Sequence, residues 1–171
     1  MKIAINGFGR IGRLVYRLMK EDDFFDVVAI NDLSSSEEMA YLLRYDTNHR
    51  TYDKDITFDS EGIIVDGKKT RVYSEMDPSN LPWGELGIDL VFECTGKFTK
   101  KEDANKHILA GAKKVLISAP GKGDMKTIVY NVNDDILTSD DIIVSAASCT
   151  TNCLAPIVKV LDDNFGIERG F

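Results

Sequence analysis

The chain has 171 residues, of which 43% are hydrophobic and 29% are charged, and its formal net charge is −7. This length accommodates one α/β domain with a full core, or one domain and the beginning of another, but not two complete domains. No apolar run approaches the length of a membrane helix, the start does not resemble a leader, and no basic cluster could neutralise rows of phosphates. We therefore expect a soluble, cytoplasmic protein that binds neither membranes nor nucleic acid. Three irregularly spaced cysteines predict reduced thiols rather than a disulfide framework.

Short, almost continuously apolar segments alternate with helical patterns along the chain. The predicted strands, each typical of a strand covered on both faces, are residues 2–6, 27–31, 89–94, 114–118 and 142–146. Apolar residues spaced three and four apart predict helices around residues 11–19, 39–43 and 104–109. This alternation predicts an α/β fold, a doubly wound and mostly parallel Rossmann sheet with right-handed crossovers.

Residues 52–73 break the alternation. Three short β-branched segments, 56–59, 63–65 and 70–73, are separated by turn-forming residues, and Asp66-Gly67 favours a tight two-residue hairpin. We expect an antiparallel hairpin insertion at the edge of the sheet.

A glycine-rich segment, Asn-Gly-Phe-Gly-Arg-Ile-Gly (6–12), follows the first predicted strand and opens the first predicted helix. In this context G-x-G-x-x-G is typical of a dinucleotide site: Gly7 allows the tight turn, Gly9 lets the backbone approach a pyrophosphate, and Gly12 lets the helix pack closely on the strand. Asp32 ends the second strand, where its carboxylate can accept hydrogen bonds from both ribose hydroxyls and would repel a 2′-phosphate. The pattern therefore favours NAD over NADP. The alternative to a dinucleotide site is a tight turn that binds no ligand.

Two further turns follow predicted strands and reach the same edge of the sheet. Thr95-Gly96 follows the predicted strand 89–94, and Ser118 ends the predicted strand 114–118 and opens the turn after it. Ligands of open parallel sheets bind at this edge, so these residues either contact the cofactor or form ordinary turns.

The segment Ser-Ala-Ala-Ser-Cys-Thr-Thr-Asn-Cys (145–153) lies where the last predicted strand turns into a helix. If Ser148 caps this helix, Cys149 lies among unpaired amides at the positive end of the helix dipole, which favours the thiolate. This position favours a nucleophile, although a small buried residue at a strand–helix junction is the alternative. We expect Cys153, one turn further on, in the core, and Cys94 to be inert at the end of a buried strand.

The chain contains only two histidines, the usual partners of a catalytic thiol. His107 lies in a charged helical segment and is interpreted as a surface residue, and His49 belongs to a polar loop. Neither is expected to be a general base. The residues thus predict a nucleophile and a dinucleotide site without a base.

Segments 5–13, 31–32, 113–120 and above all 147–156 make the chain resemble the phosphorylating, NAD-dependent glyceraldehyde-3-phosphate dehydrogenase family along its whole length. The resemblance implies that Cys149 is the nucleophile, that Ser148 and Thr150 help to hold substrate and phosphate, and that no metal is involved. Many relatives have arginine where this chain has Met76, so a cation near the adenine is absent while a backbone contact could remain. The implied cofactor contacts are Gly7, Phe8, Gly9, Arg10, Ile11, Asn31, Asp32, Met76, Thr95, Gly96 and Ser118.

The implied reaction is the glycolytic oxidation of an aldehyde phosphate with NAD and inorganic phosphate. Thiolate attack gives a thiohemiacetal, hydride passes to the nicotinamide, and phosphate cleaves the thioester. The family's catalytic histidine lies just beyond a segment like 163–171. The resemblance therefore implies an NAD-binding domain over residues 1–148, followed by the first helix and start of a truncated catalytic domain over 149–171.

Such a chain is expected to bind NAD with little or no turnover. There are two alternatives. One is a fragment of an erythrose-4-phosphate dehydrogenase, and the other is a non-catalytic module for nucleotide binding or assembly. The resemblance implies a homotetramer for the full-length parent. For this chain we expect self-association, because the helix over 149–164 carries apolar residues that would be left in water.

Overall fold

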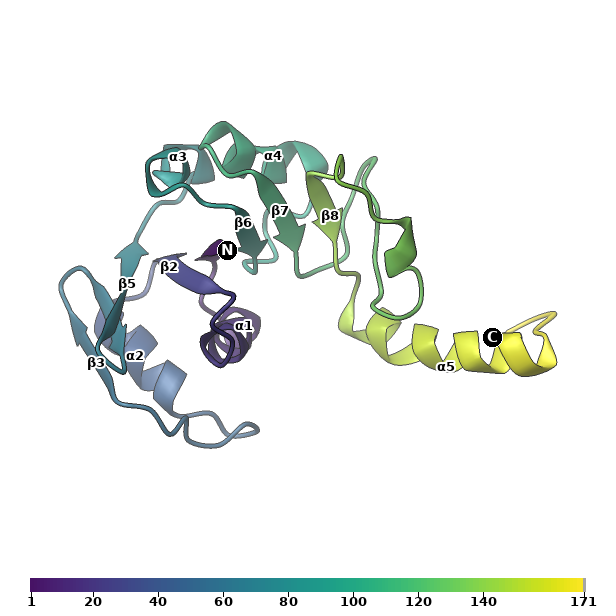
Figure 1. Ribbon diagram of the computed structural model, residues 1–171, viewed down its shortest axis with the longest axis horizontal. Helices are drawn as coiled ribbons and strands as arrows, with labels where there is room; N and C mark the ends of the chain where they lie inside the picture. The colour runs from purple at the N-terminus through teal and green to yellow at the C-terminus, as the bar shows by residue number, and fades with distance from the viewer. Residues whose placement is uncertain (171) are drawn as a thin grey trace.

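The computed structural model describes residues 1–170, so Phe171, the last residue of the predicted second segment, lies outside the described residues. The strands are β1 (Lys2–Asn6), β2 (Asp26–Asn31), β3 (Ile56–Asp59), β4 (Gly62–Val65), β5 (Lys68–Tyr73), β6 (Leu90–Glu93), β7 (Lys114–Ile117) and β8 (Ile143–Ser145). The helices are α1 (Arg10–Lys20), α2 (Ser36–Arg44), α3 (Trp83–Leu86), α4 (Lys101–Leu109) and α5 (Cys149–Phe165), with short 3-10 turns η1 (Pro78–Asn80) and η2 (Asp134–Ile136) (Figure 1). Within residues 1–170 no helix is both long and apolar enough to span a membrane.

All eight strands form one sheet in the order β3-β4-β5-β2-β1-β6-β7-β8. From β5 to β8 every neighbouring pair is parallel. The chain begins in the middle with β1, adds β2 beside it, crosses to the edge strand β3, comes back inward through β4 to β5, and then passes to the other side of β1 with β6. The predicted doubly wound Rossmann sheet is confirmed, and its strand order reverses between β1 and β6, where ligands of such sheets bind.

The hairpin insertion is confirmed for two of its three strands. β3 pairs antiparallel with β4, β4 pairs antiparallel with β5, and Asp66 and Gly67 both have positive φ, 50° and 76°, as a tight hairpin turn requires. The third strand was wrongly assigned to the insertion, because β5 also pairs parallel with β2. It completes the first half of the parallel sheet, so only β3 and β4 are additions at its edge.

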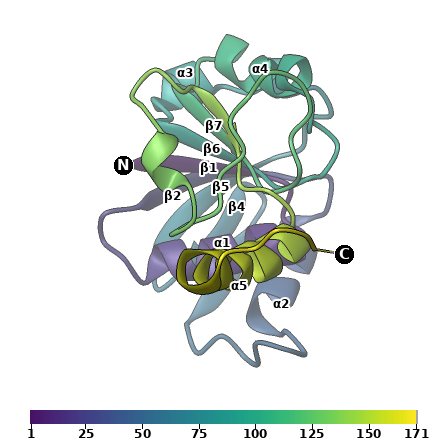
Figure 2. The same ribbon diagram turned by 90° about the vertical axis from the view of Figure 1, so that its right-hand side faces the viewer.

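Helices cover both faces of the sheet: α1 and α2 lie on one side and α3 and α4 on the other (Figure 2). In β1, Ile3 and Ile5 pack into the core beneath α1 and α2, whereas Ala4 packs into the core beneath α3 and α4. This alternation follows from the two-residue period of a strand. Because both faces are covered, the central strands are apolar at nearly every position, as predicted.

Helix α5 differs from the other helices because it projects away from the sheet (Figure 1). It contains no buried residue. The apolar residues expected to be left in water are indeed exposed: Leu154, Ile157, Val158, Val160 and Leu161. Cys153, expected in the core, is also exposed, and that prediction was wrong. No described element covers the side of α5 on which Cys153 lies.

Candidate functional site

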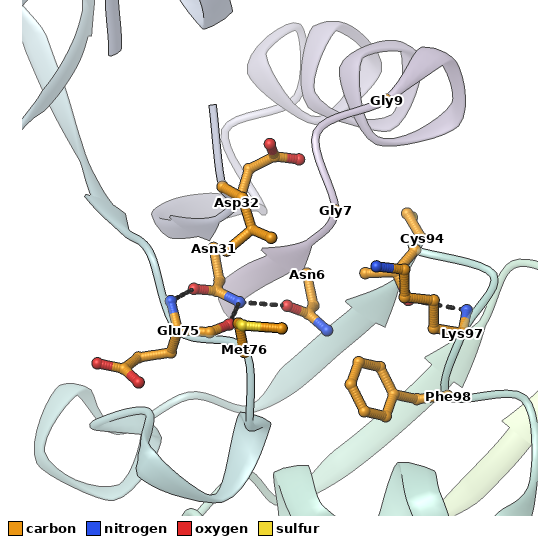
Figure 3. A pocket seen from close by; sticks show the side chains of 12 residues that line it. Asn6, Gly7, Gly9, Asn31, Asp32, Glu75, Met76, Cys94, Lys97 and Phe98 are labelled. Carbon is orange, nitrogen blue, oxygen red and sulfur yellow. Dashed lines mark hydrogen bonds between the residues drawn. The ribbon is translucent and has the colours of Figure 1, made fainter. Parts of the chain in front are cut away.

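A cavity of about 370 Å³ lies at the carboxyl ends of the central strands, where the strand order reverses (Figure 3). Six of the predicted cofactor residues line it: Gly7, Gly9, Asn31, Asp32, Met76 and Thr95. Six further lining residues were not predicted: Asn6, Leu33, Glu75, Cys94, Lys97 and Phe98. Each of these lies within two positions of a predicted residue, so the turns were found correctly while their full extent was not.

Gly7 brings the turn after β1 against the turn after β6. Its φ is +92°, and a Cβ at this position would lie 2.7 Å from the backbone nitrogen of Thr95 and 2.9 Å from the carbonyl carbon of Cys94. A Cβ on Gly12 would lie 2.1 Å from the carbonyl oxygen of Gly7. No side chain fits at either position. The two glycines therefore hold strand, loop and helix together at the point of reversal.

The start of α1 leaves backbone N–H groups open at the rim of the cavity. Gly9 is the N-cap, no side chain caps the helix, and the first turn contains no acidic residue. Such an end attracts anions because its unpaired N–H groups and the helix dipole both carry positive charge. Arg10 and Ile11 begin this turn and are exposed, but neither lines the cavity. Phe8 does not line it either, because its side chain is buried in the core.

Asp32 joins the end of β2 to the glycine loop. Its Oδ2 accepts a hydrogen bond of 2.6 Å from the N–H of Phe8, and its Oδ1 accepts one of 2.9 Å from the N–H of Ser34. Burial by itself raises the pKa of Asp32, but these backbone hydrogen bonds outweigh burial and hold the pKa below its ordinary value. The cavity wall therefore carries a fixed negative charge, which accepts hydrogen bonds from hydroxyls and repels phosphate.

Asn31, the neighbour of Asp32 at the end of β2, fixes the segment that follows β5 (Figure 3). Its side-chain amide donates to Asn6 Oδ1 at 2.7 Å and to the carbonyl of Glu75 at 2.9 Å, and its oxygen accepts from the N–H of Glu75 at 2.8 Å. The segment carrying Met76 is thereby attached to β1 and β2. The Met76 side chain itself is 77% exposed.

The two remaining predicted contacts near the cavity lie just outside it. Gly96 forms the turn between the lining residues Thr95 and Lys97, and the N–H of Lys97 donates to the Thr95 hydroxyl at 3.0 Å. Ser118 follows β7, and its hydroxyl donates to the carbonyl of Glu93 at 3.1 Å. The Ser118 contact ties the start of the turn after β7 to the end of β6.

The thiol motif forms a capped helix start, as predicted. Ser148 is the N-cap of α5, and its hydroxyl oxygen accepts from the N–H of Thr151 at 3.0 Å. It also lies 2.9 Å from the hydroxyl of Thr150. Cys149 and Thr150 are exposed, and neither lines the cavity, because β8 lies two strands away from β6. The structure thus places the predicted nucleophile and the cavity along the same edge of the sheet without bringing them together.

Two family models match parts of the chain. Residues 1–101 match the family model described as "Glyceraldehyde 3-phosphate dehydrogenase, NAD binding domain", and residues 148–171 match the model of the C-terminal domain of the same enzyme. The chain belongs to the glyceraldehyde-3-phosphate dehydrogenase family. NAD is accordingly its cofactor.

Three relatives illustrate the similarity. Glyceraldehyde-3-phosphate dehydrogenase of Clostridium pasteurianum is 55% identical over 99% of this chain and 51% of its own length. The enzyme of Mycoplasma pneumoniae is 52% identical over 99% of this chain and 51% of its own length. "Glyceraldehyde-3-phosphate dehydrogenase A, chloroplastic" of Nicotiana tabacum is 55% identical over 99% of this chain and 44% of its own length. The chain spans about half the length of the curated relatives that it matches.

The residues at the cavity fit the dinucleotide of this family. Nothing lies within 4 Å of a Cβ built on Gly9, so the start of α1 is open on the side from which a pyrophosphate would approach. Asp32 presents a carboxylate suited to ribose hydroxyls. No cluster of three or more metal-ligating side chains occurs among residues 1–170.

The interpretation of His107 as a surface residue was wrong. Its side chain is completely buried, and its Nδ1 and Nε2 contact Trp83 Nε1 at 3.0 Å and Glu93 Oε2 at 3.1 Å. The charged neighbours of His107 suggested exposure, but it lies three residues after the buried Ala104, on the same face of α4. That spacing was the signal that could have revealed it.

His49 is half exposed and lies in the loop before β3, where its Nδ1 is 3.0 Å from Asp46 Oδ1. β3 and β8 are the two edges of the sheet, so this loop and Cys149 belong to opposite ends of the strand order. Cys94, in contrast, borders the cavity. Burial raises the pKa of the Cys94 thiol to about 11, although its hydrogen bond with Ser118 opposes the change. This thiol is therefore protonated at neutral pH.

Proposed function

We propose that this chain binds NAD in the cavity between β1 and β6, as the nucleotide-binding portion of a phosphorylating glyceraldehyde-3-phosphate dehydrogenase. The observation that carries the proposal is the contact of Gly7 with the turn after β6, at the reversal of the strand order and beside the fixed carboxylate of Asp32. This combination of a glycine turn, an open helix start and an acid after β2 is the one that dinucleotides require.

Each wall of the cavity then has a role. The backbone N–H groups of Gly9, Arg10 and Ile11 bind the pyrophosphate, while Asp32 accepts hydrogen bonds from the adenosine ribose. Asn31 holds the segment carrying Met76 at the adenine. The cofactor residues after β6 and β7 lie toward the nicotinamide: Thr95, Gly96 and Ser118.

NAD, when bound, supplies a hydride acceptor. The chain's own contribution to the chemistry is Cys149, which is exposed in the first turn of α5 and whose Sγ is the attacking atom. Ser148, fixed as the helix cap, and Thr150, on the same turn, hold the aldehyde phosphate and inorganic phosphate.

We further propose that the chain by itself turns over little substrate. Both of its histidines are committed elsewhere, His107 in the core and His49 in the loop before β3. The absence of buried residues in α5 supports a boundary between a nucleotide domain, 1–148, and a following segment, 149–171. It stays a prediction that the full-length enzyme is a cytoplasmic homotetramer. The preference for a glyceraldehyde phosphate over an erythrose phosphate also stays a prediction.

Calorimetric titration with NAD, ADP-ribose and NADP tests the binding proposal. We expect NAD and ADP-ribose to bind with similar affinity, since the adenosine side of the cavity is complete, and NADP to bind at least about tenfold more weakly. Equal binding of NAD and NADP would contradict the role of Asp32. In parallel, aldehyde, NAD and phosphate are mixed with the chain, and the absence of NADH absorbance distinguishes binding from turnover.

A further inference from the structure

A group of buried polar side chains lies beneath the cavity and joins four elements of the fold. We call it the Glu93 cluster: Asn6 of β1, Trp83 of α3, Glu93 of β6, Thr95 after β6, and His107 of α4. Trp83, Glu93 and His107 are completely buried, and Asn6 is 1% exposed. Buried polar groups that are fully hydrogen-bonded fix a single local arrangement, because each lost bond leaves an unpaired group without water.

Glu93 is the centre of the cluster. Its Oε1 accepts from the N–H of Thr95 at 2.8 Å and from the Thr95 hydroxyl. Its Oε2 contacts Asn6 Nδ2 at 2.5 Å and His107 Nε2 at 3.1 Å. Two of these partners, Asn6 and Thr95, line the cavity. The carboxylate therefore holds two cavity residues from below, one at the end of β1 and one after β6.

His107 can bind Glu93 in only one way. The indole N–H of Trp83 is a donor without acceptor capacity, so His107 Nδ1, at 3.0 Å, must accept from it. The ring proton is thereby assigned to Nε2, which donates to Glu93. The imidazole lies nearly parallel to the Trp83 ring, at 22° with centroids 6.4 Å apart, and the ring of Phe98, a cavity residue, packs edge-on against it at 6.3 Å.

Hydrogen bonds extend the cluster to the other wall. Asn6 Oδ1 accepts from Asn31, and Asn31 bonds the backbone of Glu75 through both its amide and its oxygen. A continuous chain of contacts thus runs from α3 and α4, through Glu93, to both walls of the cavity.

We propose that His107 is a positioning residue for the nucleotide cavity, acting through Glu93 to hold Thr95 and Asn6 in place. The effect on NAD affinity rests on the proposed function, whereas the effect on Thr95 does not. His107 touches no ligand itself. Its role is to orient the carboxylate and to support Phe98 from behind.

The test compares two amide replacements. In His107→Gln the amide nitrogen can occupy the region of Nε2 and reach Glu93, whereas in His107→Asn the shorter amide corresponds to Nδ1 and stops short of it. A matched control is Tyr16→Phe, because Tyr16 is equally buried and its hydroxyl bonds Thr70, 3.1 Å away, which in turn donates to Val27. Neither His107 nor Tyr16 lines the cavity.

The first readout is amide hydrogen exchange at Thr95 in the nucleotide-free chain, measured relative to the global unfolding of each variant. The second is NAD affinity by calorimetry, and the third is the emission of Trp83, the single tryptophan. We expect His107→Asn to accelerate Thr95 exchange and to weaken NAD binding by about tenfold. His107→Gln should recover most of both, and Tyr16→Phe should lower stability while changing neither.

The proposal would be overturned if His107→Asn changed Thr95 exchange and NAD affinity no more than Tyr16→Phe does. His107 would then only fill the core. If the unaltered chain binds no NAD although Thr95 exchange depends on residue 107, the proposed function fails and the positioning role stands. Should His107→Asn not fold, Trp83→Phe removes the donor that fixes the tautomer, together with part of the buried indole ring. It should change Thr95 exchange in the same direction by a smaller factor, and an unchanged rate would again overturn the proposal.

Discussion

The reversal point between β1 and β6 and the start of α5 carry the two motifs that most clearly mark this sequence, yet they are stabilised in different ways. At the reversal point the contacts join distant parts of the chain: Asn6 bonds Glu93 across 87 positions, and Phe8 bonds Asp32 across 24. At the start of α5 the capping hydrogen bond of Ser148 spans three positions. The first region is a three-dimensional arrangement, and the second is a local one.

The difference shows which function each region can perform within the described residues. Long-range contacts bury the cavity floor and fix the directions of its side chains, so a ligand meets a preformed site. Local capping fixes only the first turn of α5, and both Cys149 and the rest of that helix are left in water. A nucleophile needs a positioned base and substrate contacts as well as a capped helix. Binding is thus supported more fully than chemistry.

The strongest way to break the reversal point is Gly7→Ala. The new Cβ would lie 2.7 Å from a backbone atom of Thr95 at a φ of +92°, so the turn after β1 must move away from the turn after β6. We expect a loss of about 3 kcal/mol in the free energy of unfolding, measured with urea, and no detectable NAD binding.

Gly67→Ala is the matched control, because Gly67 has a similar φ of +76° but nothing within 4 Å of its Cβ. It should cost only about 1 kcal/mol for the unfavourable φ and leave NAD binding unchanged. Equal losses in the two variants would show that the contact with Thr95 is unimportant.

Thiol labelling compares the two regions directly. Cys94 borders the cavity with its pKa raised to about 11, while Cys149 and Cys153 are exposed on α5. Since each pKa unit changes the thiolate fraction tenfold, Cys94 should label about a hundredfold more slowly than an ordinary thiol at pH 8 and should accelerate as the pH rises toward 11. We expect Cys149 to react fastest. Faster labelling of Cys94 than of Cys149 in the folded chain would contradict the assignment of the nucleophile.

Asp32→Asn sharpens the comparison at the cavity wall. The substitution preserves the size of the side chain but removes the fixed negative charge beside the ribose. We expect NAD to bind about tenfold more weakly and the preference over NADP to disappear, both measured by calorimetry. Glu75→Gln is a suitable control, because it removes another carboxylate from the cavity lining while the bonds of Asn31 to the Glu75 backbone remain. A preference for NAD that survives Asp32→Asn would assign selectivity elsewhere.

The same carboxylate gives stability a pH dependence with a defined sign. Because the folded state lowers the pKa of Asp32, the unfolded chain binds the proton first as the pH falls from neutral. Its contribution is therefore complete above the ordinary value of about 3.9 and is lost as the pH falls through the lower folded value. Urea unfolding of the unaltered chain and of Asp32→Asn should differ by a constant amount above about pH 5 and converge below pH 4. A difference that grows on acidification would reverse the assigned sign.

The sequence correctly predicted the features of the fold that depend on local residue patterns. Continuous apolar runs located β1, β2, β6, β7 and β8 to within one or two residues, and the glycine spacing located the cavity. The sequence did not predict features that depend on a contact with a distant part of the chain. The third strand of the predicted insertion joined the parallel sheet because β2 offered a free edge, which no local signal in β5 reveals.

His107 shows the same limit at the level of one side chain. Its neighbours in α4 are charged, and its two hydrogen-bond partners lie 14 and 24 positions away. Only the fold brings Glu93 and Trp83 to it. Cys153 is the opposite case: its spacing from Cys149 suggested the core, but burial needs a covering element, and none covers it within residues 1–170.

The smallest effect on folding is expected from removing α5. No residue of this helix is buried, so deleting residues 149–171 exposes little apolar surface elsewhere. We expect the free energy of unfolding of residues 1–148 to lie within about 0.5 kcal/mol of that of the whole chain, as for surface changes in general. A loss of several kcal/mol would show that α5 belongs to the nucleotide domain.

The same deletion should have a clear effect on self-association. Burying an exposed apolar side chain contributes roughly 1.5–3 kcal/mol, and five of them on one exposed helix form a patch that soluble monomers avoid: Leu154, Ile157, Val158, Val160 and Leu161. We expect light scattering to show a mass for the whole chain that rises above 19.1 kDa with concentration, while residues 1–148 stay monomeric. Replacing Leu154 and Ile157 with serine should weaken the association without shortening the chain. A mass that stays at 19.1 kDa at high concentration would mean that the exposed side of α5 does not mediate contact between copies.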